Sequence, residues 1–228
     1  MLMVGDSIQE EFYFTLLSSF WKHREENCNP SLAKTVHCAS NKTSGGPNFQ
    51  VAFIRNDYLS LNAGEPATDG DRPWVAHINK FESLGKATIL IINRGAHYVN
   101  DSTLVVELRT TMRYLKAAHP NLLIIYRSTS PGHMDYLKYF NSAPLSAYHI
   151  DLKNDLYHYA DFARQNNLTR SLLCTEFPEV VYMDVYPSTA LRADSHADPL
   201  HYCNPGPIDN WVRFLFNTIA LLNATAVK

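Results

Sequence analysis

The chain has 228 residues, which is enough for one domain with a well-buried core, and we predict a single domain over residues 1–228. Its 20 basic and 22 acidic side chains nearly cancel, so the charge indicates no nucleic-acid partner. No run of 18 apolar residues and no signal peptide occurs, so no segment of the printed sequence is expected to span a membrane.

Apolar runs alternate with amphipathic stretches, a pattern typical of a parallel sheet with helices on both faces. The predicted strands are Leu2–Val4, Gln50–Arg55, Thr88–Asn93, Leu122–Arg127 and Val180–Val185. The predicted helices are Ile8–Trp21, Ser102–Ala118 (capped by Asp101), Leu152–Gln165 and Ile208–Leu222. The stretch Leu61–Pro73 is rich in Gly and Pro and is predicted to be a surface loop. In such sheets the ligand site lies beyond the carboxyl ends of the strands.

The first predicted strand runs directly into Gly5-Asp6-Ser7. A serine hydroxyl becomes a nucleophile when an imidazole takes its proton and a carboxylate orients that imidazole. A turn from strand to helix presents Ser7 at a helix N-terminus, where backbone N–H groups favour developing negative charge. The alternative is an ordinary turn, because all three residues are turn formers. We interpret Ser7 as the nucleophile of a hydrolase or an acyl transferase.

The base and the carboxylate are predicted on one late loop, as Asp198 and His201. We prefer His201 to His133 as the base because it shares a loop with a carboxylate. Asp194 with His196 is a rival pairing. Two Asp and two His within eight residues also suggest a metal site, but their spacing fits no standard ligand set. We therefore predict no metal and no cofactor.

Acyl transfer passes through an oxyanion, which requires fixed hydrogen-bond donors. Candidates are the backbone N–H of Ser7, the side-chain amide of Asn93 at a strand end, and a glycine N–H from the loop with Gly45 and Gly46. The alternative for Asn93 is a role as a turn or capping residue. The alternative for the two glycines is that they belong to an ordinary loop. Arg127 could hold a substrate oxygen or serve as a structural ion-pair partner.

The cysteines and glycosylation motifs favour the secretory pathway. The four cysteines allow three pairings, of which we predict Cys28–Cys38 and Cys174–Cys203. Asn-x-Ser/Thr motifs, typical of a glycoprotein, occur at Asn41, Asn100, Asn167 and Asn223. The alternative is a cytosolic protein with free buried thiols.

With these segments in hand, the chain resembles the PC-esterase group of the SGNH (GDSL-like) hydrolase superfamily, and most of all the trichome-birefringence-like and related glycan O-acetyltransferases. Four blocks carry the resemblance in order: Gly5-Asp6-Ser7; Asn93-Arg94-Gly95-Ala96-His97-Tyr98; Arg127-Ser128-Thr129-Ser130-Pro131-Gly132-His133; and Asp198-x-x-His201-Tyr202-Cys203-x-Pro205-Gly206-x-x-Asp209-x-Trp211. It implies a three-layer α/β/α sandwich of the flavodoxin-like kind.

The resemblance also implies a mechanism. Ser7, Asp198 and His201 become a catalytic triad, Asn93 becomes an oxyanion donor, and Ser7 carries an acetyl group to a sugar hydroxyl or to water. The acetyl donor would be acetyl-CoA or an acetylated sugar, and Arg127, His97 and Tyr98 are expected to bind substrate. The sequence departs from the family in three ways. The N-terminal membrane anchor and subdomain of the plant members are missing, the stretch from Arg192 to His201 is compressed, and the superfamily's block-two glycine has no certain counterpart.

Our leading hypothesis is therefore an O-acetyltransferase that acts on a polysaccharide or glycan in the Golgi lumen or outside the cell. Any membrane contact would be made through the missing anchor. The first alternative is a carbohydrate acetylesterase with the same triad. A second, of another class, is a non-catalytic glycan-binding module. A nucleotide-binding domain is disfavoured because no glycine-rich phosphate loop such as G-x-G-x-x-G occurs.

Overall fold

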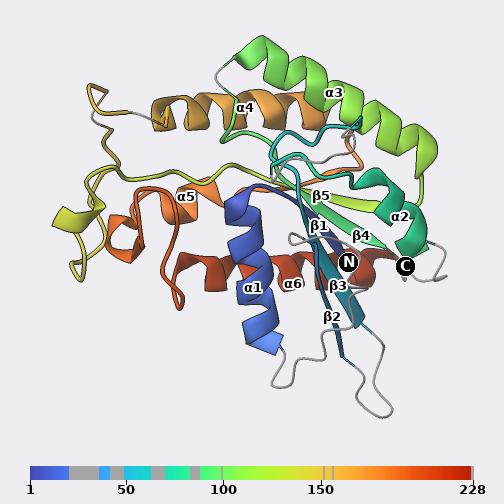
Figure 1. The fold of residues 1–228 in the computed structure, drawn as a ribbon, viewed down its shortest axis with the longest axis horizontal. Coiled ribbons are helices and arrows are strands. Elements are labelled where there is room, and N and C mark those ends of the chain that lie inside the picture. Colours follow the sequence, from blue (N-terminus) through green and yellow to red (C-terminus); the bar gives the residue numbers. More distant parts are fainter. Residues whose placement is uncertain are drawn as a thin grey trace.

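A computed structural model describes residues 1–20, 36–41, 49–62, 70–82, 88–98, 100–150, 152–155 and 157–226. One sheet lies between two layers of helices (Figure 1). Its strands are β1 (Leu2–Gly5), β2 (Val36–Asn41), β3 (Phe49–Arg55), β4 (Ile89–Ile92), β5 (Leu123–Arg127) and β6 (Val181–Met183). The predicted α/β/α architecture is confirmed.

The strand order in the sheet is β2-β3-β1-β4-β5-β6. The last five strands are parallel, whereas β2 pairs antiparallel with β3 at the edge. The parallel strands thus follow the doubly wound flavodoxin-like order, which reverses direction between β1 and β4. Ligand sites in such sheets lie at that reversal, so Ser7, directly after β1, and Asn93, directly after β4, stand at the expected place. The edge strand β2 was not predicted, because its sequence Val-His-Cys-Ala-Ser-Asn has no apolar run.

The helices are α1 (Ser7–Phe20), α2 (Val75–Glu82), α3 (Asp101–Ala118), α4 (Tyr159–Glu176), α5 (Tyr186–Thr189) and α6 (Pro207–Ala226). The predicted helix at Leu152–Gln165 is wrong in position. The Asp155 carboxylate accepts the N–H groups of Tyr159 and Ala160, so α4 begins there. The predicted cap of α3 is also wrong by one residue, because Asn100 accepts the Thr103 N–H at 3.0 Å. Helix α2 was not predicted, and residues 63–69 of the predicted loop lie outside the described residues.

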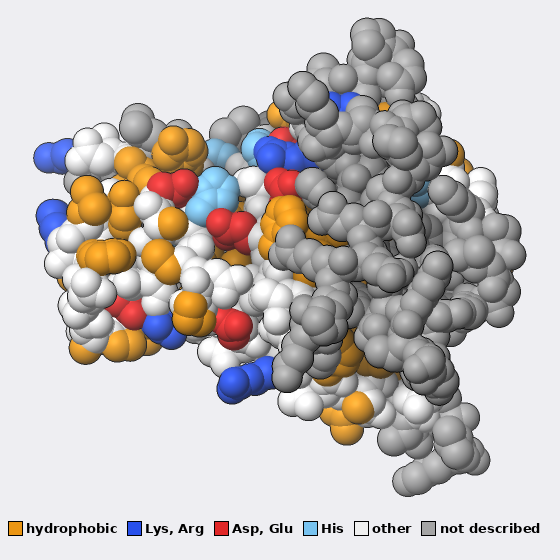
Figure 2. Space-filling view, turned by 60° about the horizontal axis from the view of Figure 1, so that its bottom comes forward, with side chains coloured by type: hydrophobic (Ala, Val, Ile, Leu, Met, Phe, Trp, Pro, Cys, Tyr) orange, Lys and Arg blue, Asp and Glu red, His pale blue; other side chains and the backbone are white. Residues whose placement is uncertain are grey.

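The face of the molecule drawn in Figure 2 is mixed in charge within its described part. On the face drawn in Figure 2, Lys and Arg side chains lie singly among acidic, histidine and apolar ones and form no basic patch within the part that the structure describes. No helix in the described ranges is long and apolar enough to cross a membrane.

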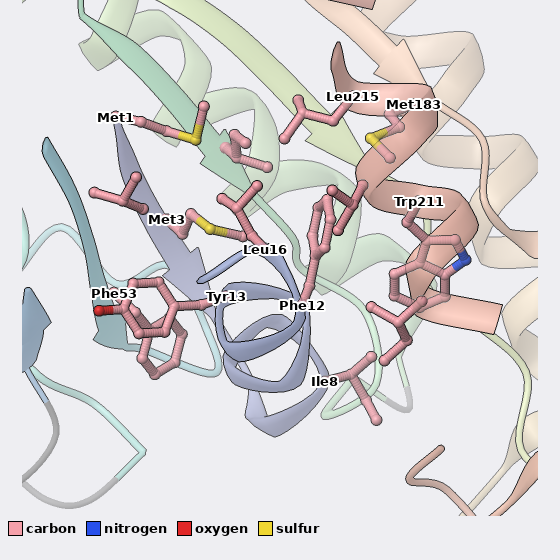
Figure 3. Close-up of a cluster of buried hydrophobic side chains, with 14 of the residues drawn as sticks. Met1, Met3, Ile8, Phe12, Tyr13, Leu16, Phe53, Met183, Trp211 and Leu215 are labelled. Carbon is pink, nitrogen blue, oxygen red and sulfur yellow. The ribbon is translucent and has the colours of Figure 1, made fainter. Parts of the chain in front are cut away.

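The sheet separates two apolar cores because successive side chains of a strand point to opposite faces. Met3 points to the face covered by α1 and α6, where Phe12 meets Trp211 edge-on with ring centroids 5.8 Å apart (Figure 3). Leu2 and Val4 point to the other face, which α2, α3 and α4 cover. Packing on both faces fixes β1 and therefore the turn that carries Ser7.

The predicted Cys174–Cys203 disulfide is wrong, since both cysteines are free. Cys174 is exposed on α4, whereas Cys203 precedes α6 on the opposite face of the sheet. Cys28 lies outside the described residues, so its pairing with Cys38 stays a prediction.

Candidate active site

The turn from β1 to α1 presents Ser7 at the first position of the helix. The Asp6 carboxylate caps α1, because its Oδ1 accepts the N–H groups of Ile8 and Gln9, each at 3.1 Å. A Cβ at Gly5 would lie 2.9 Å from Gln9 Cβ, so the tight turn requires glycine at this position. Ser7 is partly buried, and its backbone N–H belongs to the helix N-terminus, which favours negative charge.

Ser7, His201 and Asp198 form one hydrogen-bonded chain. The Ser7 Oγ lies 2.8 Å from His201 Nε2, and His201 Nδ1 lies 2.7 Å from Asp198 Oδ2. Asp198 is therefore placed to hold the proton on Nδ1, which leaves the Nε2 lone pair for the serine hydroxyl. This arrangement is able to deprotonate Ser7 as it attacks a carbonyl carbon.

Asp198 is itself fixed within its loop. Its Oδ1 accepts the backbone N–H groups of Leu200 and His201, each at 2.8 Å. Burial opposes ionisation, but these two N–H groups and the His201 ring outweigh it and lower the pKa of Asp198 below its usual value. Asp198 is therefore ionised at neutral pH and able to stabilise an imidazolium.

Two buried histidines support this loop from behind. His196 Nδ1 lies 3.1 Å from the His201 carbonyl oxygen, and His196 Nε2 lies 2.8 Å from His133 Nδ1. The His133 backbone N–H donates to the Pro199 carbonyl at 2.7 Å. Burial lowers the pKa of both rings, that of His196 to about 3, so both are neutral at pH 7. Sequence reasoning weighed both histidines as catalytic groups, and neither contacts Ser7.

The rival pairing of Asp194 with His196 is not formed. The Asp194 carboxylate is held instead by Arg192, whose Nε and Nη2 each lie 2.9 Å from one of its oxygens. Ser195 Oγ donates a further hydrogen bond to the same carboxylate at 2.9 Å.

Glu11 is a carboxylate near the triad that sequence reasoning missed. It lies one helical turn after Ser7, and its Oε2 accepts the Tyr202 backbone N–H at 3.2 Å. Burial raises the pKa of Glu11 to about 7, against the attraction of His201, which lowers it. The four-residue spacing from Ser7 was a signal that could have identified Glu11.

Arg127 is 1% exposed, so it has no free surface with which to reach a substrate. Its Nε donates to Gln9 Oε1 at 2.7 Å, and its Nη2 lies 3.5 Å from Asp6 Oδ1. The guanidinium also lies over the Trp211 ring, 5.3 Å from its centroid. This geometry favours the structural alternative, in which Arg127 braces the turn that carries Ser7.

Asn93 lies beside that turn, since its backbone N–H donates to the Val4 carbonyl at 3.2 Å. Its side chain is 1% exposed, and Nδ2 donates to the Arg127 carbonyl at 2.9 Å and to Thr129 Oγ1 at 3.4 Å. The amide would have to give up one of these bonds to serve an oxyanion. The backbone N–H of Ser7, at the helix N-terminus, is therefore the better candidate for the oxyanion donor. The other candidates, Gly45 and Gly46, lie outside the described residues.

His97 and Tyr98 face different surroundings. The buried Tyr98 hydroxyl accepts from Arg94 Nε at 2.9 Å and contacts the Glu107 carboxylate, and burial raises its pKa. His97 is exposed, and its Nε2 lies 3.4 Å from Asp57 Oδ2. The Tyr98 hydroxyl is thus engaged within the protein, whereas His97 is accessible to solvent. Substrate binding by either residue stays a prediction.

The cavities that border the described part of the molecule include the following two. One, of about 540 Å³, is lined by Gly132, His133 and Tyr159, next to the loop with Asp198. The other, of about 510 Å³, is lined by Arg94, Tyr98 and neighbouring polar groups. Within the described ranges, no group of three His, Cys, Asp or Glu side chains is arranged to hold a metal ion.

Comparison with known proteins identifies the fold. No protein-family model matches the chain, and no curated protein sequence does. Among solved structures, the periplasmic domain of a lipopolysaccharide acetyltransferase from Salmonella ser. Paratyphi A has a TM-score of 0.55 at 14% identity, over 96% of this chain and 83% of that one. A peptidoglycan O-acetylesterase has a TM-score of 0.55 at 9% identity, over 98% of this chain and 91% of that one. At these identities the likeness is one of fold.

Proposed function

We propose that the protein is a serine-dependent O-acetyltransferase of the PC-esterase type within the SGNH-like hydrolases, and that it acetylates a polysaccharide or glycan. The observation that carries the proposal is the chain of hydrogen bonds from Ser7 Oγ through His201 to Asp198, with distances of 2.8 and 2.7 Å. The fold shared with an acetyltransferase domain and an O-acetylesterase supports the same chemistry.

In the first half-reaction, Ser7 Oγ attacks the carbonyl carbon of an acetyl donor while His201 Nε2 takes the hydroxyl proton. Asp198 stabilises the imidazolium that forms, and the Ser7 N–H at the start of α1 faces the developing oxyanion. His201 then returns the proton to the leaving group of the donor. The products are acetylated Ser7 and the free donor alcohol or thiol.

In the second half-reaction, His201 Nε2 takes a proton from a sugar hydroxyl, and the sugar oxygen attacks the acetyl carbon. The bond from that carbon to Ser7 Oγ then breaks, and His201 returns the proton to Ser7. Water could replace the sugar, which would make the protein an acetylesterase. Solvent access favours this second candidate, since the side chains of His201 and Asp198 are 30% and 49% exposed. The fold is similar both to an acetyltransferase domain and to an O-acetylesterase, so the test must distinguish a sugar acceptor from water.

The remaining parts of the proposal follow from this chemistry. The donor would be acetyl-CoA or an acetylated sugar, and the mechanism uses no metal. A glycan substrate implies a site of action in the secretory pathway or outside the cell. A glycan-binding module without catalysis would need none of the contacts among Ser7, His201 and Asp198.

The test is turnover of 4-nitrophenyl acetate with and without xylo-, cello- and chito-oligosaccharides, beside a Ser7→Ala control. Acetylated oligosaccharide, detected by mass spectrometry and dependent on Ser7, is the result we expect. Free acetate alone would make the protein an esterase. No turnover, from a folded sample that still binds a glycan, would leave the non-catalytic module.

A further inference from the structure

His196 has no part in the proposed reaction so far, although its ring lies directly behind the loop that carries the base. We propose that His196 is a positioning residue whose Nδ1–H donates to the His201 backbone carbonyl, and that His133 fixes the tautomer of the ring that makes this bond possible. This inference rests on the proposed function and adds the groups that hold its general base against Ser7.

The loop depends on such a support because its catalytic side chains are not buried. The side chains of His201 and Asp198 are 30% and 49% exposed, so packing around them fixes them only in part. His196, by contrast, is 0% exposed, and the centroid of its ring lies 4.2 Å from that of the buried Tyr202 ring. The close-packed His196 ring is therefore a fixed point from which the loop can be held.

The two histidine rings have fewer protons than contacts to fill. Both are neutral at pH 7, so each carries one N–H. Their outer nitrogens face oxygens that only accept. His133 Nε2 lies 3.0 Å from the Ala190 carbonyl oxygen, and His196 Nδ1 lies 3.1 Å from that of His201. Between the rings, His133 Nδ1 and His196 Nε2 lie 2.8 Å apart. Two protons cannot fill three contacts, so one contact holds none.

The surroundings of the rings decide which contact that is. The inner contact is the shortest, and leaving it empty would set two nitrogen lone pairs 2.8 Å apart. The His196 ring has two backbone acceptors, the carbonyl groups of His201 and Asp198. Among the described groups, His133 Nε2 faces one, the carbonyl of Ala190. A proton on His196 Nδ1 is therefore favoured, and His133 Nδ1–H then donates to His196 Nε2 and holds that tautomer.

The bond from His196 fixes the position of the base. The His201 carbonyl also accepts the Ala197 N–H at 2.9 Å, and the His201 N–H donates to Asp198 Oδ1 at 2.8 Å. Both peptide groups of His201 are thus held, which keeps its Nε2 2.8 Å from Ser7 Oγ. Because a misplacement of about 1 Å can lower a rate about 10²-fold, a loosened loop should lower kcat.

Two amide variants of His196 distinguish its two nitrogens. The side-chain nitrogen of asparagine is two bonds from Cβ, as Nδ1 is, so His196→Asn keeps a donor for the His201 carbonyl. The nitrogen of glutamine is three bonds from Cβ, as Nε2 is, so His196→Gln keeps the contact with His133 and loses the bond to the loop. With 4-nitrophenyl acetate, we expect His196→Gln to lower kcat about 10- to 100-fold with KM within about twofold, and His196→Asn to stay within about threefold of wild type.

His119→Gln is the matched control for a loss of stability. His119 is also buried, its Nδ1 lies 2.9 Å from Glu82 Oε2, and it precedes β5, at the end of the sheet opposite Ser7. Its replacement should lower the melting temperature without changing kcat.

A second measurement needs neither a variant nor turnover. The long-range ¹H–¹⁵N NMR spectrum of wild-type protein reports which ring nitrogen of each histidine carries the proton. We expect protons on Nδ1 of His196 and on Nδ1 of His133.

Three results would overturn the inference: a proton on His196 Nε2, equal losses of kcat in the two amide variants, or no loss in His196→Gln. The proposed function fails separately, when folded wild-type protein neither turns over the ester nor becomes acetylated on Ser7. The tautomer of His196 then still decides whether its ring donates to the loop.

Discussion

Ionised Glu11 should lower the stability of the folded protein and raise kcat, and the variant Glu11→Gln tests both effects. The carboxylate is held beside His201 and accepts the Tyr202 N–H at 3.2 Å. Glutamine keeps an acceptor oxygen for that N–H but removes the negative charge. We therefore expect the variant to fold with the same contacts and to differ from wild type in electrostatics.

The size and sign of the stability effect follow from the pKa. Burial raises the pKa of Glu11 from 4.5 to about 7, so the folded state holds this proton more tightly than the unfolded state does. At about 1.4 kcal/mol per pKa unit, ionised Glu11 lowers the free energy of unfolding by about 3 kcal/mol above pH 7. This loss of stability begins near pH 4.5, grows as the pH rises and is complete above pH 7. The free energy of unfolding of Glu11→Gln should therefore equal that of wild type at pH 4.5 and exceed it at pH 8.

The assay is thermal and urea unfolding of both proteins from pH 4.5 to 8. At pH 8 the variant should melt roughly 6 to 12 °C higher, on the scale of 2 to 4 °C per kcal/mol for a chain of this length. Its kcat should fall about tenfold, since one nearby negative charge no longer stabilises the His201 imidazolium, about 1.4 kcal/mol. Equal melting temperatures at pH 8 would refute the reasoning.

Glu176→Gln is the matched control. Glu176 is an exposed carboxylate whose hydrogen bond with Arg109 lowers its pKa, so its contribution has the opposite sign. The control variant should not melt above wild type at pH 8.

Three further predictions concern the supporting residues. Asp198→Asn should lower kcat about 10³- to 10⁴-fold in ester turnover with little change in melting temperature, because the amide no longer stabilises the imidazolium; a loss under tenfold would contradict its role. Arg127→Met leaves Asp6 and Gln9 without their buried partner and should cost about 3 to 5 kcal/mol in urea unfolding, whereas an unchanged midpoint would show that the brace is dispensable. Burial lowers the pKa of His196 from 6.5 to about 3, so wild type should lose stability as the pH falls from 6.5 toward 3, and His196→Gln should lose less over that range. Parallel acid-unfolding curves would count against a buried neutral His196.

The sequence predicted the parts of the fold that depend on local pattern. The strands β1, β4 and β5 are continuous apolar runs, and the motifs that follow them meet at one edge of the sheet, where Ser7, Asp198 and His201 form their chain. The start of α4 was not predictable from periodicity, because a capping carboxylate four residues upstream decides it.

Burial explains the other differences at the candidate site. A sequence pattern identifies Arg127 and Asn93 as polar residues at strand ends, but not that each is 1% exposed and bonded within the chain. The shift in the pKa of Glu11 likewise arises from desolvation by segments distant in sequence. Such effects depend on tertiary packing, which no local motif encodes.

The central claim is that Ser7 carries the acetyl group, and intact-mass spectrometry after brief mixing with 4-nitrophenyl acetate tests it most directly. The account predicts one acetyl adduct on wild-type protein and none on Ser7→Ala, with the adduct decaying faster when an acceptor oligosaccharide is added. An adduct of equal size on both proteins, or none on a folded wild-type sample that still turns over the ester, would contradict it.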